Sequence, residues 1–176
     1  MDGRALSENV AILSWLARTF PEAGLLPTVT GDFEQGLILS DLAFCASALH
    51  PIVTRLRIPQ FFCDTPEGQT RVFEMAEVAM QPNFAIIDER LSKGEWWYGD
   101  RWSIVDAYIN WVWFRVAGTA FDVSAFPNFK RHDASTKQRP SVRRALAVNQ
   151  EVADKLAALG LAIKFSGAGA VAASKA

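Results

Sequence analysis

Apolar residues recur along this chain at intervals of three and four, which is the period of an α-helix packed against a core. The strict alternation of apolar and polar residues that is typical of strands is poor almost everywhere. The pattern therefore predicts an all-α fold, built as a helical bundle. Helical segments are expected to begin near Ser7, Asp32, Thr65, Ser103, Phe126 and Arg139, and the last is expected to end at Gly160.

Prolines predict where these helices start or bend. Thr65 followed by Pro66 opens the third segment with a capping residue and a proline at the first helical position. Pro51 lies inside the second segment, so a kink is expected next to His50. Pro82 predicts a bend or a break within the third segment. Because only a short link joins the second and third segments, they are expected to pack as an antiparallel pair.

The stretch GDRWSIVDAYINW, residues 99–111, opens the most apolar of the helices. Ser103 and Asp106 have the spacing of a reciprocal capping box, in which each side chain accepts a hydrogen bond from the backbone at the helix start. The residues that follow are apolar almost all the way round, so this helix is expected to be central. Asp106 should hold it in register, and its replacement by alanine should lower the melting temperature by several degrees.

Apolar positions also predict what lies in the core. Cys45 falls on the apolar stripe of the second segment and is most simply a small core residue. On the last helix, the residues expected to face inward are Val142, Ala145, Leu146, Val152, Ala153 and Leu156.

Composition and charge then narrow the classes of function. The chain has 176 residues, half of them hydrophobic, and a net charge of −1 with both signs interspersed, which argues against a nucleic-acid partner and favours small ligands. Cys45 and Cys63 lack the spacing of a metal site or a disulfide framework, so no metal is expected and the cytoplasm is the natural location. The longest apolar run, residues 104–118, is interrupted by polar side chains and too short for a bilayer, so no membrane association is expected.

Four motifs occur in an order and spacing that match one known family. They are DGRALSENVAILSWLARTFPEAGLLP, the pair Leu49-His50, GDRWSIVDAY and DVSAFPNFKRHDASTKQRPSVRRAL. Together they resemble the cytosolic glutathione transferases, most of all the bacterial beta-class enzymes, over about residues 2–158. The third motif is similar to the capping-box segment of that family's helical domain, and the fourth to its Phe-Pro-Asn and Arg-Pro helix starts.

The resemblance implies a domain layout. Residues 1–20 would be the last helix of a thioredoxin-like domain, 21–31 a linker, 32–160 the all-helical C-terminal domain, and 161–176 a flexible tail. Most of the thioredoxin-like domain, which carries the tyrosine, serine or cysteine that activates the glutathione thiol, would then be missing. No residue of this sequence is therefore assigned a catalytic role, and the chain by itself is expected to be catalytically silent.

The resemblance also implies a binding site for glutathione as co-substrate. Glu8 would pair with the amino group of its γ-glutamyl end, and Asn9 with the first N–H groups of the helix would receive its carboxylate. His50 matches a beta-class histidine that lines the same site, although Pro51 replaces the lysine that usually follows. Judged from the local sequence alone, Glu8 is a dipole-complementing residue in a first helical turn and His50 an ordinary buried or capping residue.

The second substrate would be a small hydrophobic electrophile. Arg115 stands where beta-class members direct a tryptophan at its pocket, so that pocket is expected to be more polar.

Two functions remain open: a transferase that is complete only with an upstream thioredoxin-like portion, or a non-catalytic helical module for binding or dimerisation. A homodimer is implied by the resemblance, and an unrelated all-α bundle is the third interpretation.

Overall fold

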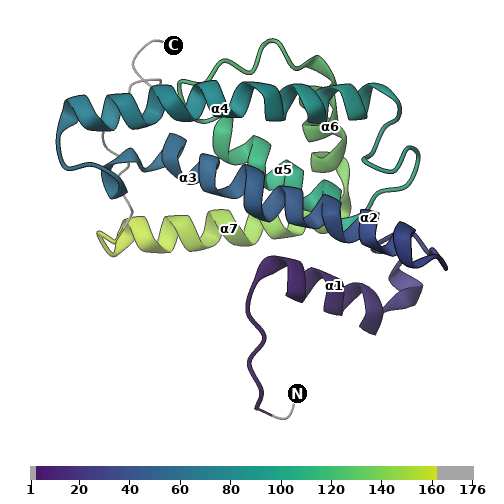
Figure 1. Cartoon of the computed structure of the whole chain (residues 1–176). Helices are drawn as coiled ribbons and strands as arrows, with labels where there is room; N and C mark the ends of the chain where they lie inside the picture. Colours follow the sequence, from purple (N-terminus) through teal and green to yellow (C-terminus); the bar gives the residue numbers. More distant parts are fainter. Residues whose placement is uncertain (1–2, 162–176) are drawn as a thin grey trace.

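The computed structural model describes residues 3–161, and throughout that range the protein is built of helices joined by turns, with no strand (Figure 1). This confirms the predicted all-α helical fold. The helices are α1 (Asn9–Thr19), α2 (Asp32–Ala43), α3 (His50–Arg57), α4 (Pro66–Ser92), α5 (Ile104–Val116), α6 (Pro127–Gln138) and α7 (Pro140–Ala158), with a π-helical turn at Phe44–Leu49 and short 3-10 turns at Pro21–Ala23 and Pro59–Phe61.

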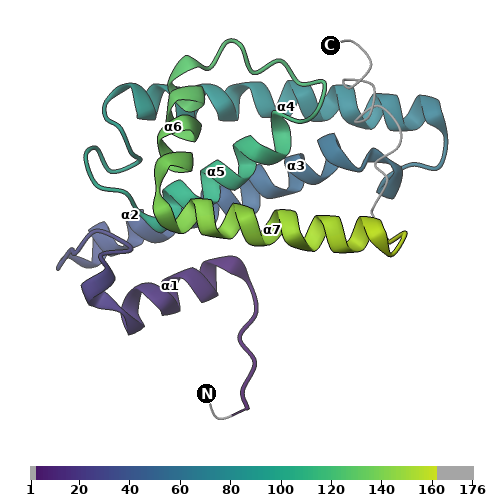
Figure 2. The same cartoon turned by 180° about the vertical axis from the view of Figure 1, so that it is seen from behind.

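Helix α5 is the centre of the bundle, as its apolar sequence predicts. It lies between α4 on one side and α7 on the other in both views, while α1 lies at the edge against α2 (Figures 1 and 2). Its buried residues are Ile104, Val105, Asp106, Tyr108, Ile109, Val112, Trp113 and Val116. These eight side chains are therefore held by packing within the bundle.

The kink expected next to His50 takes the form of the π-helical turn Phe44–Leu49. Pro51 has no backbone N–H to give to the carbonyl of Ser47, and its ring crowds that carbonyl. The backbone widens instead, and the N–H of His50 donates to the carbonyl of Cys45, five residues earlier. The turn ends directly before His50 and so fixes the direction in which the His50 side chain projects.

Helix α4 begins as predicted and is not interrupted. Thr65 caps it, since its hydroxyl oxygen accepts from the N–H of Gly68 at 3.2 Å. The break allowed for at Pro82 does not occur, because α4 runs as one helix from Pro66 to Ser92. The fully buried side chains of Met80 and Phe84, on either side of the proline, anchor both halves in the core.

The helical stretch Asp32–Arg57 is long and apolar enough, by length and composition alone, to cross a membrane. No uninterrupted apolar run marks this stretch in the sequence, so it was not predicted there. A core helix passes the same test; Leu42, Leu49 and Leu56 are fully buried in this bundle, although only 22% of the apolar window is buried.

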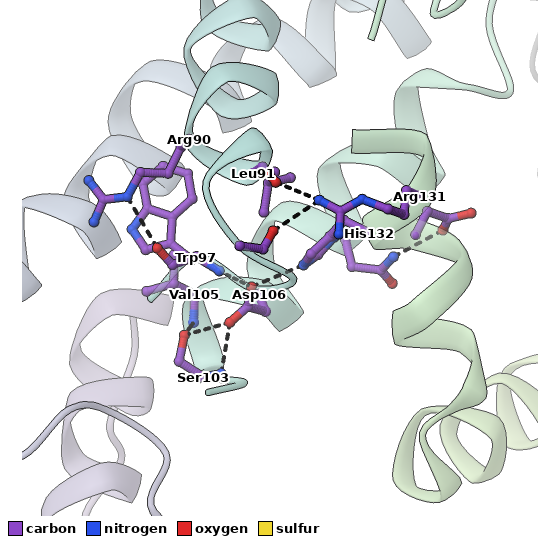
Figure 3. Close-up of polar contacts among 11 residues, drawn as sticks. Arg90, Leu91, Trp97, Ser103, Val105, Asp106, Arg131 and His132 are labelled. Atoms are coloured by element: carbon purple, nitrogen blue, oxygen red, sulfur yellow. Dashed lines mark hydrogen bonds and ion pairs between the residues drawn. The ribbon is translucent and has the colours of Figure 1, made fainter. Parts of the chain in front are cut away.

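Asp106 is the hub of a buried polar network (Figure 3). Its Oδ2 accepts from the N–H of Ser103 at 2.7 Å and from the Ser103 hydroxyl at 2.9 Å, and Ser103 Oγ in turn accepts from the N–H of Val105 at 3.2 Å. Its Oδ1 accepts from the N–H of Trp97 at 2.8 Å and lies 3.0 Å from His132 Nε2. The predicted capping box is therefore confirmed, and it also joins α5 to α6 and to the turn before α5.

Two glycines shape the turn that brings Trp97 to this carboxylate. Gly99 has φ +85°, in the left-handed region, and a Cβ on Gly94 would lie 2.6 Å from the Gly99 Cα. The close approach lets Trp96 and Gly99 exchange backbone hydrogen bonds of 2.8 and 3.0 Å. The turn therefore aims the neighbouring N–H of Trp97 at Asp106.

Helix α6 is capped by a residue of α4 rather than by its own sequence. Asp88 accepts from the N–H of Phe129 and from the side-chain amide of Asn128, both at 2.9 Å. Pro127 supplies the first helical residue, as predicted from Phe126-Pro127. The cap ties the start of α6 to the C-terminal part of α4.

The prediction that the apolar face of α7 is buried is wrong. None of its residues is buried, and Val152 and Leu156 are 49% and 37% exposed. Val142 and Leu146 are half-buried and Ala145 is exposed. The physical reason is length: α7 has 19 residues against 13 in α5, so its second half extends beyond the helix it would pack on.

Candidate functional site

Two of the three predicted site residues meet at Tyr108. Asn9 Nδ2 donates to the phenol oxygen at 3.4 Å, and His50 Nδ1 lies 3.0 Å from the same oxygen. Asn9 begins α1, His50 begins α3 and Tyr108 lies in α5, so packing of three helices brings them together. They open onto a groove of about 400 Å³, which is lined by Asn9, Leu13, His50, Ile104, Ala107, Tyr108 and Trp111.

Aromatic packing fixes the half-buried His50 ring. Its centroid lies 4.5 Å from that of Trp111, and it meets Tyr108 edge-on at an interplanar angle of 87°. The phenol of Tyr108 and His50 Nδ1 can share one proton across their 3.0 Å contact. The imidazole therefore reaches the groove in one orientation, set by the π-helical turn behind it and the rings around it.

Tyr108 acts here as a neutral phenol. Burial raises its pKa above the usual value, the hydrogen bond from Asn9 opposes that shift, and the neighbouring Cys45 and Glu8 raise the pKa further. A phenol with a raised pKa keeps its proton at neutral pH, so it donates or accepts a hydrogen bond and carries no charge. The influence of Glu8 also means that its carboxylate lies near enough to this oxygen to be felt electrostatically.

Glu8 lies outside the helix, which corrects the expectation that it sits in the first turn. It occupies the position before α1 with φ 71° and ψ 124°, and its exposed side chain makes no capping hydrogen bond. Within residues 3–161 it is the only residue other than glycine with a positive φ. Such strained backbone tends to be kept at binding sites, where it aims a side chain or a peptide group.

The start of α1 is suited to an anion. Its first turn contains no acidic residue and receives no side-chain cap, so its leading N–H groups have no side-chain acceptor. Glu8 precedes these groups and Asn9 is the first helical residue. A carboxylate acceptor and amide donors thus stand side by side, which is the arrangement that recognises an amino acid group.

Within the described residues, the lining of this groove contains no cysteine or serine, and its one phenol, that of Tyr108, is already shared between Asn9 and His50. Cys45 is fully buried, and burial raises the pKa of its thiol to about 12, so it is an inert core residue as predicted. The Tyr98 hydroxyl donates to Asp41 at 2.7 Å, away from the groove, and burial raises its pKa. The groove can bind and orient a ligand, but it offers no thiolate or lowered-pKa phenol.

Sequence reasoning missed two lining residues and one core residue. Tyr108 and Trp111 lie in the apolar helix that the sequence predicts to be central, and the spacing that puts them on one face with Ile104 was the available signal. His132, fully buried against Asp106, had no signal in the local sequence. Arg115 does border this region, with its guanidinium 5.8 Å from the ring centroid of Trp111.

Comparisons with known proteins agree with this geometry. The model of the glutathione S-transferase C-terminal domain matches residues 44–140. The glutathione S-transferase GstA of Escherichia coli O157:H7 is 31% identical over 160 residues, covering 91% of this chain and 71% of the relative. The chain belongs to the cytosolic glutathione transferase family.

Solved structures give the same answer. A bacterial beta-class glutathione S-transferase from Sphingomonas chungbukensis is 30% identical with a TM-score of 0.70, covering 84% of this chain and 70% of that one. A sphingomonad glutathione S-transferase complexed with glutathione is 27% identical with a TM-score of 0.71, at the same coverage. The fold and the family are therefore those inferred from the four sequence motifs.

Proposed function

We propose that this chain is the glutathione-facing helical part of a glutathione transferase. Transfer of glutathione to small hydrophobic electrophiles would require a thioredoxin-like portion that supplies the residue activating the thiol. The observation that carries this proposal is the meeting of Asn9 and His50 on the Tyr108 phenol, beside the strained backbone of Glu8. The sphingomonad relative described as complexed with glutathione supports the choice of ligand.

The proposed binding mode follows from the charges. Glutathione ends in a free amino acid group, for which the carboxylate of Glu8 is a partner for the ammonium. The Asn9 amide and the uncapped N–H groups of α1 would receive the carboxylate. At 3.4 Å, the bond from Asn9 to Tyr108 is long, so the amide can exchange it for a ligand oxygen at little cost. His50 would line the remainder of the site.

Two further features belong to this proposal. Exposed apolar side chains on α4, including Val78 at 69% and Ile86 at 54%, support assembly as a homodimer. The alternative function is a non-catalytic module for binding or dimerisation. It is favoured by the Tyr108 phenol, which has a raised pKa and is already engaged by His50 and Asn9, and by the lack of a cysteine or serine in the described lining of the groove.

Replacing Asn9 by alanine should weaken glutathione binding about threefold to tenfold, because it removes one charge-assisted hydrogen bond. Titration of glutathione followed by amide chemical shifts measures this, and the shifts should cluster at the start of α1. Asn149→Ala, at an exposed position of α7, is the control and should bind as the parent does. Equal affinities of both variants, or shifts confined to other helices, would contradict the binding site.

The chain by itself should conjugate glutathione to a standard aryl halide no faster than the uncatalysed reaction. The physical reason is that the described lining holds no cysteine or serine, and its Tyr108 phenol and His50 imidazole are hydrogen-bonded to each other. A fusion that places the thioredoxin-like portion of a beta-class relative before Glu8 should turn over, and Asn9→Ala should lower its kcat/KM. Measurable turnover by the unfused chain would refute the proposed lack of an activating residue. An inactive fusion that still binds glutathione would favour the non-catalytic module.

A further inference from the structure

Helix α7 and the residue that caps its end carry an apolar stripe that the rest of the described structure leaves uncovered. No residue of α7 is buried. In both views α1 lies toward the beginning of α7, and no described helix lies along the outer side of its second half (Figures 1 and 2). The stripe consists of five exposed residues: Ala145, Val148, Val152, Leu156 and Leu159. A row of exposed apolar side chains on one helix face is typical of an interaction surface.

The spacing of the stripe is symmetric about Val152. Its residues follow one another at intervals of 3, 4, 4 and 3 positions, so the order is the same in both directions along the helix. At about 100° per residue, the five side chains fall within about 80° of the helix circumference and form one straight row. Intervals of three and four are those at which the side chains of two facing helices interdigitate.

This symmetry fits a second copy of the same helix. A two-fold axis at Val152 would lay another α7 antiparallel on the first. Val148 would then pack against the partner's Leu156, and Ala145 against the partner's Leu159. A surface that pairs with itself across a two-fold axis must match its own reversed order, whereas a surface for an unrelated partner has no such requirement.

The charges beside the stripe match the same arrangement. Glu151 and Lys155 lie along one edge of it, and a two-fold axis brings the same edges of the two helices together. Each Glu151 would therefore face the partner's Lys155, and this pair occurs twice. Arg144 lies on the same edge, and it would stand opposite the partner's Gly160, just past the end of the partner's α7. The negative end of the helix dipole favours a cation there.

We propose that a second copy of this chain covers the stripe, in an antiparallel pair of α7 helices related by a two-fold axis at Val152. The interface differs from that of the homodimer proposed above, because α4 and α7 lie on opposite sides of α5 (Figures 1 and 2). The two contacts together would join dimers into a larger assembly. Five apolar side chains from each copy make a small interface, so the pairing should be reversible, with a Kd of about 10–100 μM.

A cross-link tests the geometry directly in the full chain. Cys45 is buried, so Cys63→Ser removes the one partly exposed thiol of the described residues and supplies the background. In it, Val152→Cys places two thiols face to face at the proposed axis. Diamide should accept their two hydrogens and leave an intermolecular disulfide, seen as a dimer on non-reducing electrophoresis.

Ala147→Cys in the same background is the matched control, because Ala147 is exposed on the same helix but lies outside the stripe. It should cross-link at most one tenth as fast as Val152→Cys. Equal rates for the two variants, or no disulfide from Val152→Cys at protein concentrations above the expected Kd, would overturn the proposal.

Sedimentation equilibrium tests the energetics without a cross-link. Val152→Glu puts two like charges at the axis and should weaken the pairing at least tenfold, whereas Ala147→Glu should not alter it. Glu151→Lys should also weaken it, because two lysines would face each other on each edge. The double variant Glu151→Lys/Lys155→Glu should restore it. Circular dichroism checks that each variant keeps its helices, and a double variant as weak as the single one would contradict the charge pairing.

The outcomes separate this proposal from the proposed function. Val78→Glu on α4 and Asn9→Ala at the glutathione site should leave the Val152→Cys cross-link unchanged. Self-association that Val78→Glu abolishes and Val152→Glu does not affect would assign all pairing to α4 and overturn the α7 interface. The fusion with a thioredoxin-like portion should cross-link as the chain does. Loss of the cross-link in the fusion alone would assign the stripe to that portion and would overturn the proposal.

Discussion

Asp106→Ala should lower the free energy of unfolding by about 3–5 kcal/mol, because it leaves several buried donors unpaired at once. The donors are the N–H groups of Trp97 and Ser103, the Ser103 hydroxyl and His132 Nε2, all within 3.0 Å of the carboxylate. These donors come from three places: the turn before α5, the start of α5, and α6. The loss should therefore exceed that of an ordinary helix cap, which is about 1 kcal/mol.

Urea denaturation followed by circular dichroism measures the effect, which should also appear as a fall in melting temperature of about 10 °C. Asp122→Ala is the matched control, because Asp122 also accepts a backbone N–H, that of Ser124 at 2.8 Å, but in an exposed turn. It should leave the stability nearly unchanged. If Asp106→Ala behaved like this control, the polar hub would contribute no more to folding than a surface turn.

Phe84→Ala should cost about 3–5 kcal/mol of stability through loss of buried area and creation of a cavity. Phe84 is fully buried at the centre of an aromatic cluster. Its ring centroid lies 5.0 Å from that of Phe129, 5.2 Å from those of Phe121 and Phe126, and 6.1 Å from that of Trp113. These partners come from α5, α6 and the connection between them, so the cavity cannot close by moving one helix.

The control for this change is Phe33→Ala, in which the same side chain is removed from a position that is 76% exposed. Its effect on the free energy of unfolding should be below about 0.5 kcal/mol. Chemical denaturation of both variants, analysed with the same dependence of unfolding free energy on denaturant concentration, gives the difference between their free energies of unfolding. A loss at Phe84 no larger than at Phe33 would mean that the interior relaxes around the deleted ring, contrary to the close packing described above.

The predictions that succeeded concern interactions within one or two turns of helix. The Ser103 and Asp106 pair, the Thr65 cap and the starts at Pro127 and Pro140 all depend on atoms a few residues apart. The disturbance at Pro51 was also local, although its form as a π-helical turn was not foreseen. At Pro82 the helix is not broken, and Met80 and Phe84 on either side of the proline are both fully buried in the core.

The candidate site, too, was predicted only in part. Its residues Glu8, Asn9 and His50 were named from family motifs, and their roles as ligand contacts remain predictions. The contact that organises two of them, the Tyr108 phenol, could not be inferred, because Tyr108 is 99 residues from Asn9 and 58 from His50. No local rule places Glu8 outside α1, because an acidic residue is common both just before a helix and in its first turn.

By itself the sequence determined the helices, their caps, the central place of α5 and the family, because helical period and capping depend on neighbours along the chain. The tertiary structure alone decided that His132 completes the Asp106 network, that Tyr108 joins Asn9 to His50, and that α7 leaves its apolar face open. These outcomes depend on how far helices extend past one another and which faces they share, and no local pattern encodes either quantity.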